Sequence, residues 1–314
     1  KEGRCDLVAF GRQSLADPAM PKKAQEERLE DMTPCIACLQ GCVANMYAGN
    51  PVCCLTNPFL GHEAEPLEKA EEPKKVMVIG GGVAGLSAAF IAKERGHEVT
   101  LYEAGDVLGG NMRLAAYPPG KGDITNMIRS YIHRCQKDGV KIVMNCEVTP
   151  ELIKEEKPDS VIIATGSKTL ILPIEGIDNP AIIHGSDLLD GKRAAGKKVL
   201  VVGGGMVGCE TAAFLGEQEH DVTVIEFRDT VGADVIHEHR VYLMKDFEDY
   251  GIKEITGAKV CKFYEDGVEY ETADGVRHES RGYDSVILSM GFRNYNPLEE
   301  KIKDLVPETH VIGD

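Results

Sequence analysis

The sequence has no long apolar run and little positive charge, and both shortages exclude classes of function. No apolar stretch approaches the ~18 residues that a membrane-spanning helix needs, and no signal-peptide core follows the first four residues. Lys and Arg number 35 against 51 Asp and Glu, a formal charge of -16 that leaves no basic stripe for a nucleic acid. We therefore expect a cytoplasmic protein that binds neither membranes nor nucleic acid.

The length of 314 residues, at about 150 residues per domain, predicts two domains. The sequence begins without Met, so we expect a fragment of a longer protein. Residues 5–10 are apolar enough to predict a short buried strand that ends at Gly11 and Arg12. We expect its partner strands to precede residue 1 or to be replaced by other packing. The charged run 61–75, interrupted by prolines, predicts a linker and a boundary near residue 70.

The remainder of the chain repeats itself. Residues 76–85 recur 123 positions later as residues 199–208, and residues 97–103 match residues 220–226 at the same offset. Two homologous β-α-β units are therefore predicted, and the fold class is α/β. Further strands are predicted at residues 141–144, 160–163, 260–263, 267–271 and 285–290.

Each unit carries the spacing G-x-G-x-x-G between a strand and a helix. The three glycines permit, in order, a tight turn, close approach of a pyrophosphate to the backbone, and close packing of the helix on the strand. They are Gly80, Gly82 and Gly85 in the first unit and Gly203, Gly205 and Gly208 in the second. Glu103 and Glu226 each follow the first glycine by 23 residues and can accept hydrogen bonds from ribose hydroxyls. A single glycine-rich turn of this kind also occurs where only close packing is needed. Two copies, each with a glutamate at the same distance from its first glycine, favour dinucleotide binding.

Two such units in one chain resemble the tandem FAD and NAD(P)H domains of the disulfide-reductase and thioredoxin-reductase superfamily. Residues 164–167 are similar to the crossover between those domains, and residues 310–314 to the second FAD motif, whose Asp, here Asp314, approaches the ribityl chain of the flavin. The resemblance implies that the first unit binds FAD and the second binds a nicotinamide nucleotide. Glu226 would repel a 2′-phosphate, which favours NADH, while Arg228 could pair with that phosphate and keeps NADPH open as the less favoured cofactor.

Five of the ten cysteines are crowded into one loop-like stretch. Cys35, Cys38 and Cys42 are closely spaced, and Cys54 follows after eleven residues. Four thiolates suit either zinc or an iron-sulfur cluster. Three close cysteines with a remote fourth favour a 4Fe-4S cluster, because a zinc ribbon normally has two C-x-x-C pairs. Cys53 could replace Cys54 in another register.

The order of cluster, linker, FAD unit and nicotinamide unit resembles the C-terminal part of the 2,4-dienoyl-CoA reductase and 2-enoate reductase family, the iron-sulfur branch of the Old Yellow Enzyme relatives. In that family an N-terminal (β/α)8 barrel binds FMN, and its last strand supplies a phosphate-binding Gly-Arg, matched here by Gly11 and Arg12. The family's cluster loop matches residues 34–42. The residues that follow Cys54 resemble the end of the family's cluster motif, which favours Cys54 as the fourth ligand. Gly110 and Asn111 resemble part of the family's flavin-side segment.

The resemblance implies the following segments: the end of the FMN barrel at 1–33, a 4Fe-4S segment at 34–62, a linker at 63–74, an FAD-binding domain at 75–170 and 285–314, and an NAD(H)-binding domain at 171–284. It implies the electron-input half of an ene-reductase, in which electrons pass from NADH to FAD, the cluster and FMN, and reduce the activated double bond of an enoate, enoyl-CoA or enone. No catalytic acid is assigned within this sequence.

Three alternatives remain open. One is an amine dehydrogenase of the trimethylamine dehydrogenase type, with outward electron flow. The second is an electron-transfer subunit like the small subunit of glutamate synthase, and the third is a nucleotide-binding module without turnover.

Overall fold

The computed structural model describes residue 3 and residues 5–65 and 67–313. The chain divides into two compact units. The first contains the described residues of Lys1–Ala116, Gly122–Gly166 and Asn296–Asp314, and the second contains Tyr117–Lys121 and Ser167–Tyr295. In the described part of the chain, no helix is both long and apolar enough to cross a membrane.

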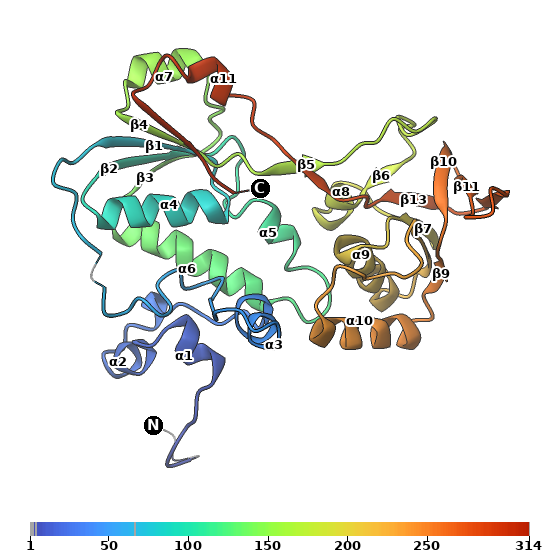
Figure 1. Cartoon of the computed structure of the whole chain (residues 1–314), viewed down its shortest axis with the longest axis horizontal. Helices are drawn as coiled ribbons and strands as arrows, with labels where there is room; N and C mark the ends of the chain where they lie inside the picture. Colours follow the sequence, from blue (N-terminus) through green and yellow to red (C-terminus); the bar gives the residue numbers. More distant parts are fainter. Residues whose placement is uncertain (1–2, 4, 66, 314) are drawn as a thin grey trace. The chain divides into compact units, whose positions relative to one another are not determined.

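The first unit is built on a parallel sheet of five strands (Figure 1). In spatial order these are β15 (Glu308–Val311), β4 (Ser160–Ile163), β1 (Lys75–Ile79), β2 (Glu98–Tyr102) and β3 (Lys141–Val143). Successive side chains of a strand point to opposite faces, so Val76 and Val78 of β1 enter one hydrophobic core while Met77 and Ile79 enter another. The central strand is thus buried on both faces, as parallel sheets usually are.

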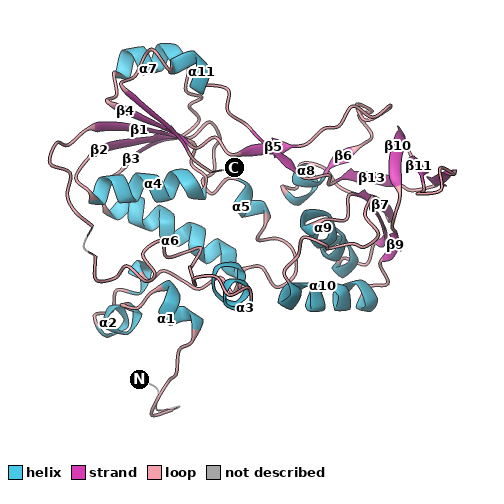
Figure 2. Cartoon of the chain, in the orientation of Figure 1, coloured by secondary structure: helices cyan, strands magenta, loops and turns pink. Residues whose placement is uncertain are grey.

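Helices supply the apolar surfaces that cover this sheet (Figure 2). They are α4 (Val83–Glu94), α6 (Asp123–Lys137), α7 (Pro150–Glu156) and α11 (Glu299–Ile302). Phe90 of α4 and Tyr131 of α6 pack edge to face, with ring centroids 5.2 Å apart, in the core that contains Val78. Ile153 of α7 and Ile302 of α11 are fully buried in the opposite core. The sheet therefore forms the middle layer of three.

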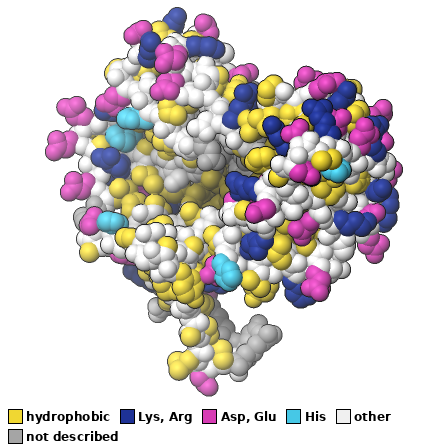
Figure 3. Space-filling model, turned by 45° about the vertical axis from the view of Figure 1, so that its right-hand side comes forward, with side chains coloured by type: hydrophobic (Ala, Val, Ile, Leu, Met, Phe, Trp, Pro, Cys, Tyr) yellow, Lys and Arg dark blue, Asp and Glu magenta, His cyan; other side chains and the backbone are white. Residues whose placement is uncertain are grey.

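Only short helical pieces precede β1 in the described chain. They are α1 (Arg12–Ala16), α2 (Met20–Gln25), the 3-10 turn η1 (Leu29–Asp31), the π-helical turn η2 (Gln40–Ala44) and α3 (Asn45–Tyr47). The predicted buried strand over residues 5–10 is wrong. Leu7 is 91% exposed, and no described strand runs beside this stretch to satisfy its backbone N–H and C=O groups. Figure 3 shows apolar side chains on this N-terminal tail.

The second unit contains a matching parallel sheet. Its strands, in spatial order, are β6 (Ile183–His184), β13 (Ser285–Leu288), β7 (Lys198–Val202), β8 (Asp221–Ile225) and β9 (Lys253–Ile255). Its helices are α8 (Gly185–Leu189), α9 (Met206–Glu217) and α10 (His237–Asp249). An antiparallel sheet of β10 (Lys259–Tyr264), β11 (Gly267–Glu271) and β12 (Arg277–Arg281) contributes Phe263 and Val268 to the core on one face of β7.

The predicted repeat is present as two equivalent units, β1-α4-β2 and β7-α9-β8, each with parallel strands. The predicted return of the chain to the first domain at residue 285 is wrong. β13 pairs with β7 and β6, so it completes the second sheet, and the second unit extends to Tyr295. The physical reason is that Ser285–Leu288 is buried throughout and fills the place beside β7 that β4 takes beside β1. Strands β5 (Ser167–Thr169) and β14 (Phe292–Asn294) pair antiparallel where the chain enters and leaves this unit.

Candidate functional site

The first glycine-rich turn is held closed by contacts that only glycine allows. Gly80 has φ +111°, and a Cβ atom there would lie 2.3 Å from the carbonyl oxygen of Ala164. A Cβ atom on Gly85 would lie 1.9 Å from the carbonyl oxygen of Gly80. Gly82, which caps α4, is different, because the nearest atom to its Cβ position is the Cα of Gly110 at 4.0 Å. Two glycines thus serve packing, and the middle one leaves open the space where a pyrophosphate would approach the helix N-terminus.

A second loop closes over this turn. The backbone N–H of Gly109 donates to the carbonyl of Gly81 at 2.8 Å, and Gly110 has φ +55°. Asn111 begins the short helix α5 (Asn111–Leu114). The predicted residues Gly110 and Asn111 therefore lie beside the turn, on the side of Gly82.

The C-terminal strand ends at the same place. The N–H of Ile312 donates to the carbonyl of Ile163 at 2.9 Å, and a Cβ atom on Gly313 would lie 3.3 Å from the Cβ of Ala84 in the first turn of α4. Asp314, predicted to approach the flavin, lies outside the described residues. The strand that precedes it, β15, ends beside the first turn of α4.

The two predicted glutamates make equivalent contacts. Glu103 accepts hydrogen bonds from the backbone N–H groups of Gly81 and Gly105, both at 2.7 Å. Glu226 accepts from the N–H groups of Gly204 and Arg228. A carboxylate has about four acceptor sites, so each side chain can hold its turn and still accept from a ribose hydroxyl.

The second glycine-rich turn repeats the packing of the first. Gly203 has φ +107°, and a Cβ atom there would lie 2.3 Å from the carbonyl oxygen of Ser289. A Cβ atom on Gly208 would lie 1.8 Å from the carbonyl oxygen of Gly203. At Gly205, however, the nearest atom to a Cβ position is a carboxylate oxygen of Asp234, at 3.2 Å. The middle glycine of this turn therefore faces a negative charge.

Sequence reasoning missed Asp234. Its Oδ1 accepts a hydrogen bond from the backbone N–H of Met206, the first residue of α9, at 2.9 Å. The repeat held a signal that would have found it, because Asp234 follows Gly203 by the same interval at which Asn111 follows Gly80.

The five clustered cysteines line one small cavity. Its other walls include the apolar side chains of Leu15, Ile36, Leu39 and Leu55, and Arg12 also reaches it. Burial raises the pKa of the Cys38 thiol, and the neighbouring thiols of Cys42, Cys54 and Cys35 raise that pKa further. These four thiols therefore lie close together in a cavity with apolar walls, which suits a cluster held by thiolates.

Cys53 differs from the other four cysteines. Its side chain is exposed, and the amide of Asn45 lies 3.5 Å from its sulfur. Its backbone N–H donates to the carbonyl of Gly41 at 2.8 Å, and a Cβ atom on Gly41 would lie 2.7 Å from the Cys53 carbonyl oxygen. Cys53 thus has a structural role in closing the loop, and the sulfur of Cys54 lies 3.3 Å from the hydroxyl of the buried Thr56.

Thiolates bind either a single zinc ion or an iron-sulfur cluster. Among the described residues, no three His, Cys, Asp or Glu side chains converge closely enough to hold a single metal ion. Zinc draws four sulfurs to about 2.3 Å from one centre, whereas an iron-sulfur cluster spreads its thiolates over several irons. The preference for a cluster over zinc therefore rests on the sequence spacing, with three cysteines close together and a remote fourth.

Helix α1 holds the cysteine loop. The side-chain oxygen of Gln13 accepts from the N–H of Cys35, and its amide donates to the carbonyl of Thr33, both at 2.9 Å. Arg12 is the first residue of α1, and the exposed Gly11 precedes it. The predicted FMN-phosphate residues thus lie directly beside the predicted cluster.

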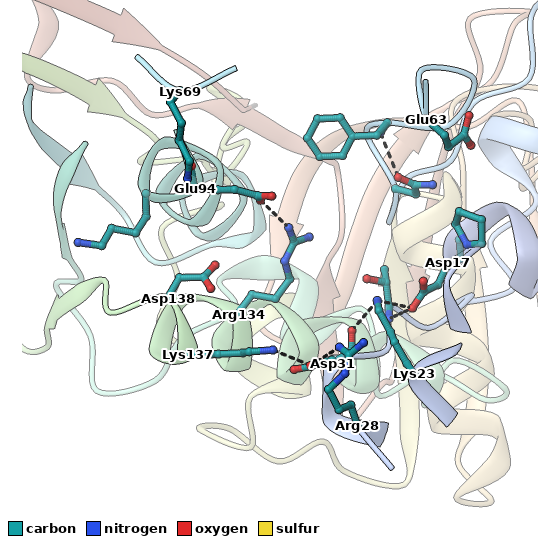
Figure 4. A pocket seen from close by; sticks show the side chains of 16 residues that line it. Asp17, Lys23, Arg28, Asp31, Glu63, Lys69, Glu94, Arg134, Lys137 and Asp138 are labelled. Carbon is teal, nitrogen blue, oxygen red and sulfur yellow. Dashed lines mark hydrogen bonds and ion pairs between the residues drawn. The ribbon is translucent and has the colours of Figure 1, made fainter. Parts of the chain in front are cut away.

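Charged side chains attach the segment before the cysteines to α6 (Figure 4). The carboxylate of Asp31 accepts from Lys137 at 2.5 Å, from Arg28 at 2.7 Å and from His133 at 3.0 Å. Lys23 donates to the Asp31 carbonyl at 2.9 Å. Lys137 and then Arg28 lower the pKa of Asp31, so this carboxylate stays charged in the folded chain.

An Asp31→Asn variant is expected to loosen this attachment by about 1–2 kcal/mol, because charge-assisted hydrogen bonds to Lys137, Arg28 and His133 are lost. A carboxyl group whose pKa is lower in the folded chain stabilises the fold above its unfolded pKa, and this contribution is lost as the pH falls. Trypsin should therefore cut residues 20–30 faster in the variant at neutral pH. In the wild type the same contribution should be lost progressively as the pH falls below about 4, the unfolded pKa, towards the lower pKa of the folded chain; amide hydrogen exchange of residues 20–31 measures this, since trypsin is inactive in acid.

Glu30→Gln is the matched control, because Glu30 is 87% exposed and lies 3.9 Å from the His133 ring nitrogen. It makes the same charge change one residue away and should leave the cutting rate unchanged. Equal rates for wild type and Asp31→Asn would show that the ion pairs contribute nothing to the attachment.

Comparison with known proteins gives matches over most of the chain. The model of the pyridine nucleotide-disulphide oxidoreductase family matches residues 74–306. A cinnamate reductase of Clostridium sporogenes is 34% identical, over 99% of this chain and 47% of that protein. An NADH oxidase of Thermoanaerobacter brockii is 36% identical, over 100% of this chain and 49% of that protein. The chain therefore spans about half the length of the curated relatives it matches.

A solved structure of another reductase also matches this chain. A 2-naphthoyl-CoA reductase in complex with 2-naphthoyl-CoA superposes with a TM-score of 0.94 at 35% identity, over 100% of this chain and 48% of that chain. These similarities confirm the predicted resemblance to the C-terminal part of the 2,4-dienoyl-CoA and 2-enoate reductase family. The family model covers well over half of the sequence and both glycine-rich turns. The chain therefore belongs to the pyridine nucleotide-disulphide oxidoreductase family.

Proposed function

We propose that this chain is the electron-input half of an NADH-dependent flavin and iron-sulfur ene-reductase. Family membership implies binding of FAD and NAD(P)H. Our proposal places FAD on the first unit, the nicotinamide nucleotide on the second, a 4Fe-4S cluster on the cysteine loop and FMN in the part of the relatives that this chain does not span. Its substrate would be an activated carbon-carbon double bond of an enoate, enoyl-CoA or enone.

The observation that carries the proposal is the packing of the cysteine loop on the first unit. Ile36, between Cys35 and Cys38, is buried in the same hydrophobic core as Phe90 of α4 and Val78 of β1. The hydroxyl of Tyr131 in α6 lies 3.4 Å from the carbonyl oxygens of Leu55 and Thr56, next to Cys54. The loop is thus fixed to the unit that carries the proposed flavin turn.

Such packing suits an electron route from a nicotinamide to a cluster. A nicotinamide gives up two electrons as a hydride and a cluster carries one at a time, so a flavin between them supplies the conversion. In the first unit, Gly82 leaves space for the pyrophosphate, and Glu103 offers acceptor sites to a ribose. Gly205 and Glu226 take the same positions in the second unit. The intact second turn favours nicotinamide input over an amine dehydrogenase with outward electron flow.

The test is a steady-state assay of the chain loaded with FAD. It is expected to oxidise NADH with ferricyanide, and kcat/KM for NADPH should be lower by about tenfold or more. Two unit charges ~4 Å apart at an effective dielectric of ~20 repel by ~4 kcal/mol before screening, and Glu226 would oppose the 2′-phosphate in this way. Enoates and enoyl-CoA esters should not be reduced, because the described residues form no (β/α)8 barrel.

Glu226→Gln is the control for nucleotide preference. Glutamine keeps an acceptor for the Gly204 N–H and removes the charge, so the NADH preference should shrink while NADH oxidation persists. A higher kcat/KM for NADPH in the wild type would contradict the preference. Reduction of an enoate by this chain would show that the double-bond site is misplaced in our proposal.

A further inference from the structure

A carboxylate lies at the start of helix α9, in the proposed nicotinamide unit. Asp234 accepts the N–H of Met206 through Oδ1, and its Oδ2 is 3.2 Å from the Cβ position of Gly205. The first N–H groups of a helix have no partner within the helix and are the donors that bind a pyrophosphate in this kind of fold. Asp234 therefore occupies one of the donors that the nucleotide needs.

Among the described residues of the first unit, none places such a charge in the corresponding position. The repeat aligns Asp234 with Asn111, a neutral amide. The surroundings of Gly82 are also more open, since the nearest atom to its Cβ position is a backbone carbon of Gly110 at 4.0 Å. The two turns are otherwise alike in their packing glycines and their glutamates. They differ by one negative charge where the pyrophosphate would bind.

We infer that Asp234 competes with the nucleotide pyrophosphate for the N-terminus of α9. Asp234 thereby lowers the affinity of the second unit for its nucleotide. The inference rests on the proposed function of the second unit. A bound diphosphate must displace the Asp234 carboxylate from the Met206 N–H and then remain near its charge. Both effects weaken binding. A nicotinamide nucleotide must leave after each hydride transfer, whereas FAD stays bound. The negative charge of Asp234 in the second turn favours release of the nucleotide, and the neutral Asn111 in the first turn is compatible with a cofactor that stays bound.

The experiment uses the chain loaded with FAD, so that the first unit is already filled. Binding of ADP and of adenosine is measured by isothermal titration for the wild type and for Asp234→Asn. The asparagine oxygen can still accept the Met206 N–H, so the variant removes the charge and keeps the helix cap. The Kd of ADP is expected to fall about tenfold, since one like charge near the diphosphate is gone, while the Kd of adenosine stays the same.

Asp229→Asn is the matched control. Asp229 is an exposed carboxylate in the same segment between β8 and α10, whereas the carboxylate that accepts the Met206 N–H is that of Asp234. It should leave the Kd of ADP within twofold of the wild type. The same tenfold gain for Asp229→Asn would point to a general charge effect and overturn the inference. An unchanged or higher Kd of ADP in Asp234→Asn would overturn it too.

The proposed function fails separately from this inference. If the wild-type chain and Asp234→Asn both bind neither ADP nor NADH, the second unit is not a nicotinamide site and both ideas fall. If NADH binds and supports ferricyanide reduction with equal affinity in the two proteins, the inference alone is wrong.

Discussion

A Gly82→Val variant is expected to fold and to be purified without FAD. The backbone of Gly82 has φ −70°, which valine adopts without strain. Within the described part of the chain, only the Gly110 Cα lies within 4 Å of the new Cβ, apart from chain neighbours. The structure thus accommodates the first added carbon, and the space it takes is the space that the pyrophosphate needs. Flavin absorbance per mole of protein should fall by more than tenfold, with the circular dichroism spectrum unchanged.

Gly205→Val is the matched variant in the second unit. It has φ −71°, and its Cβ meets the movable carboxylate of Asp234. This variant should keep its flavin and lose the ability to oxidise NADH. If flavin instead survives Gly82→Val and disappears with Gly205→Val, the assignment of the two cofactors to the two units is inverted.

A Cys54→Ser variant is expected to lose most of the brown absorbance of anaerobically reconstituted protein. Serine is a harder ligand than cysteine and binds an iron-sulfur cluster poorly, since such clusters prefer soft sulfur. We predict Cys54 as the fourth ligand because Cys53 is exposed and its backbone closes the loop against Gly41, whereas Cys54 is less exposed. Iron and sulfide content, together with the visible spectrum, measure the loss.

Cys53→Ser is the control from the neighbouring position. Its sulfur is exposed and lies 3.5 Å from the Asn45 amide, a contact that a hydroxyl can replace, and its loop contact to Gly41 is made by the backbone. The variant should keep the full cluster content. A colourless Cys53→Ser protein with a brown Cys54→Ser protein would move the fourth ligand to Cys53.

The two nucleotide units could be predicted because their signals are local. A glycine with a positive φ, a helix starting at the next turn and a strand ending in Glu depend on residues within one β-α-β unit. Because the pattern occurs twice, it indicates nucleotide binding, whereas a single glycine-rich turn could serve packing alone. The strands near residues 141, 160, 260 and 267 are also predicted correctly, because turn residues bound each of them.

The features that sequence reasoning missed depend on distant partners. The segment 5–10 is apolar enough for a strand, but a strand forms only where another strand accepts its hydrogen bonds. The strand β13 was assigned to the wrong unit, because an apolar run does not say which of two similar sheets it completes. The ion pairs of Asp31 with Lys137 and His133 join residues about a hundred positions apart, and no motif marks such a charge.

The glutamate contacts have a consequence for the entropy of nucleotide binding. Glu103 accepts from the N–H groups of Gly81 and Gly105 within the chain itself, so these hydrogen bonds order the turn as the chain folds and reduce the conformational entropy that nucleotide binding must still remove. An alanine at residue 103 would therefore restore that freedom to the turn as well as remove an acceptor for a ribose. A glutamine, which keeps an acceptor for the turn, separates the ordering of the loop from recognition of the nucleotide.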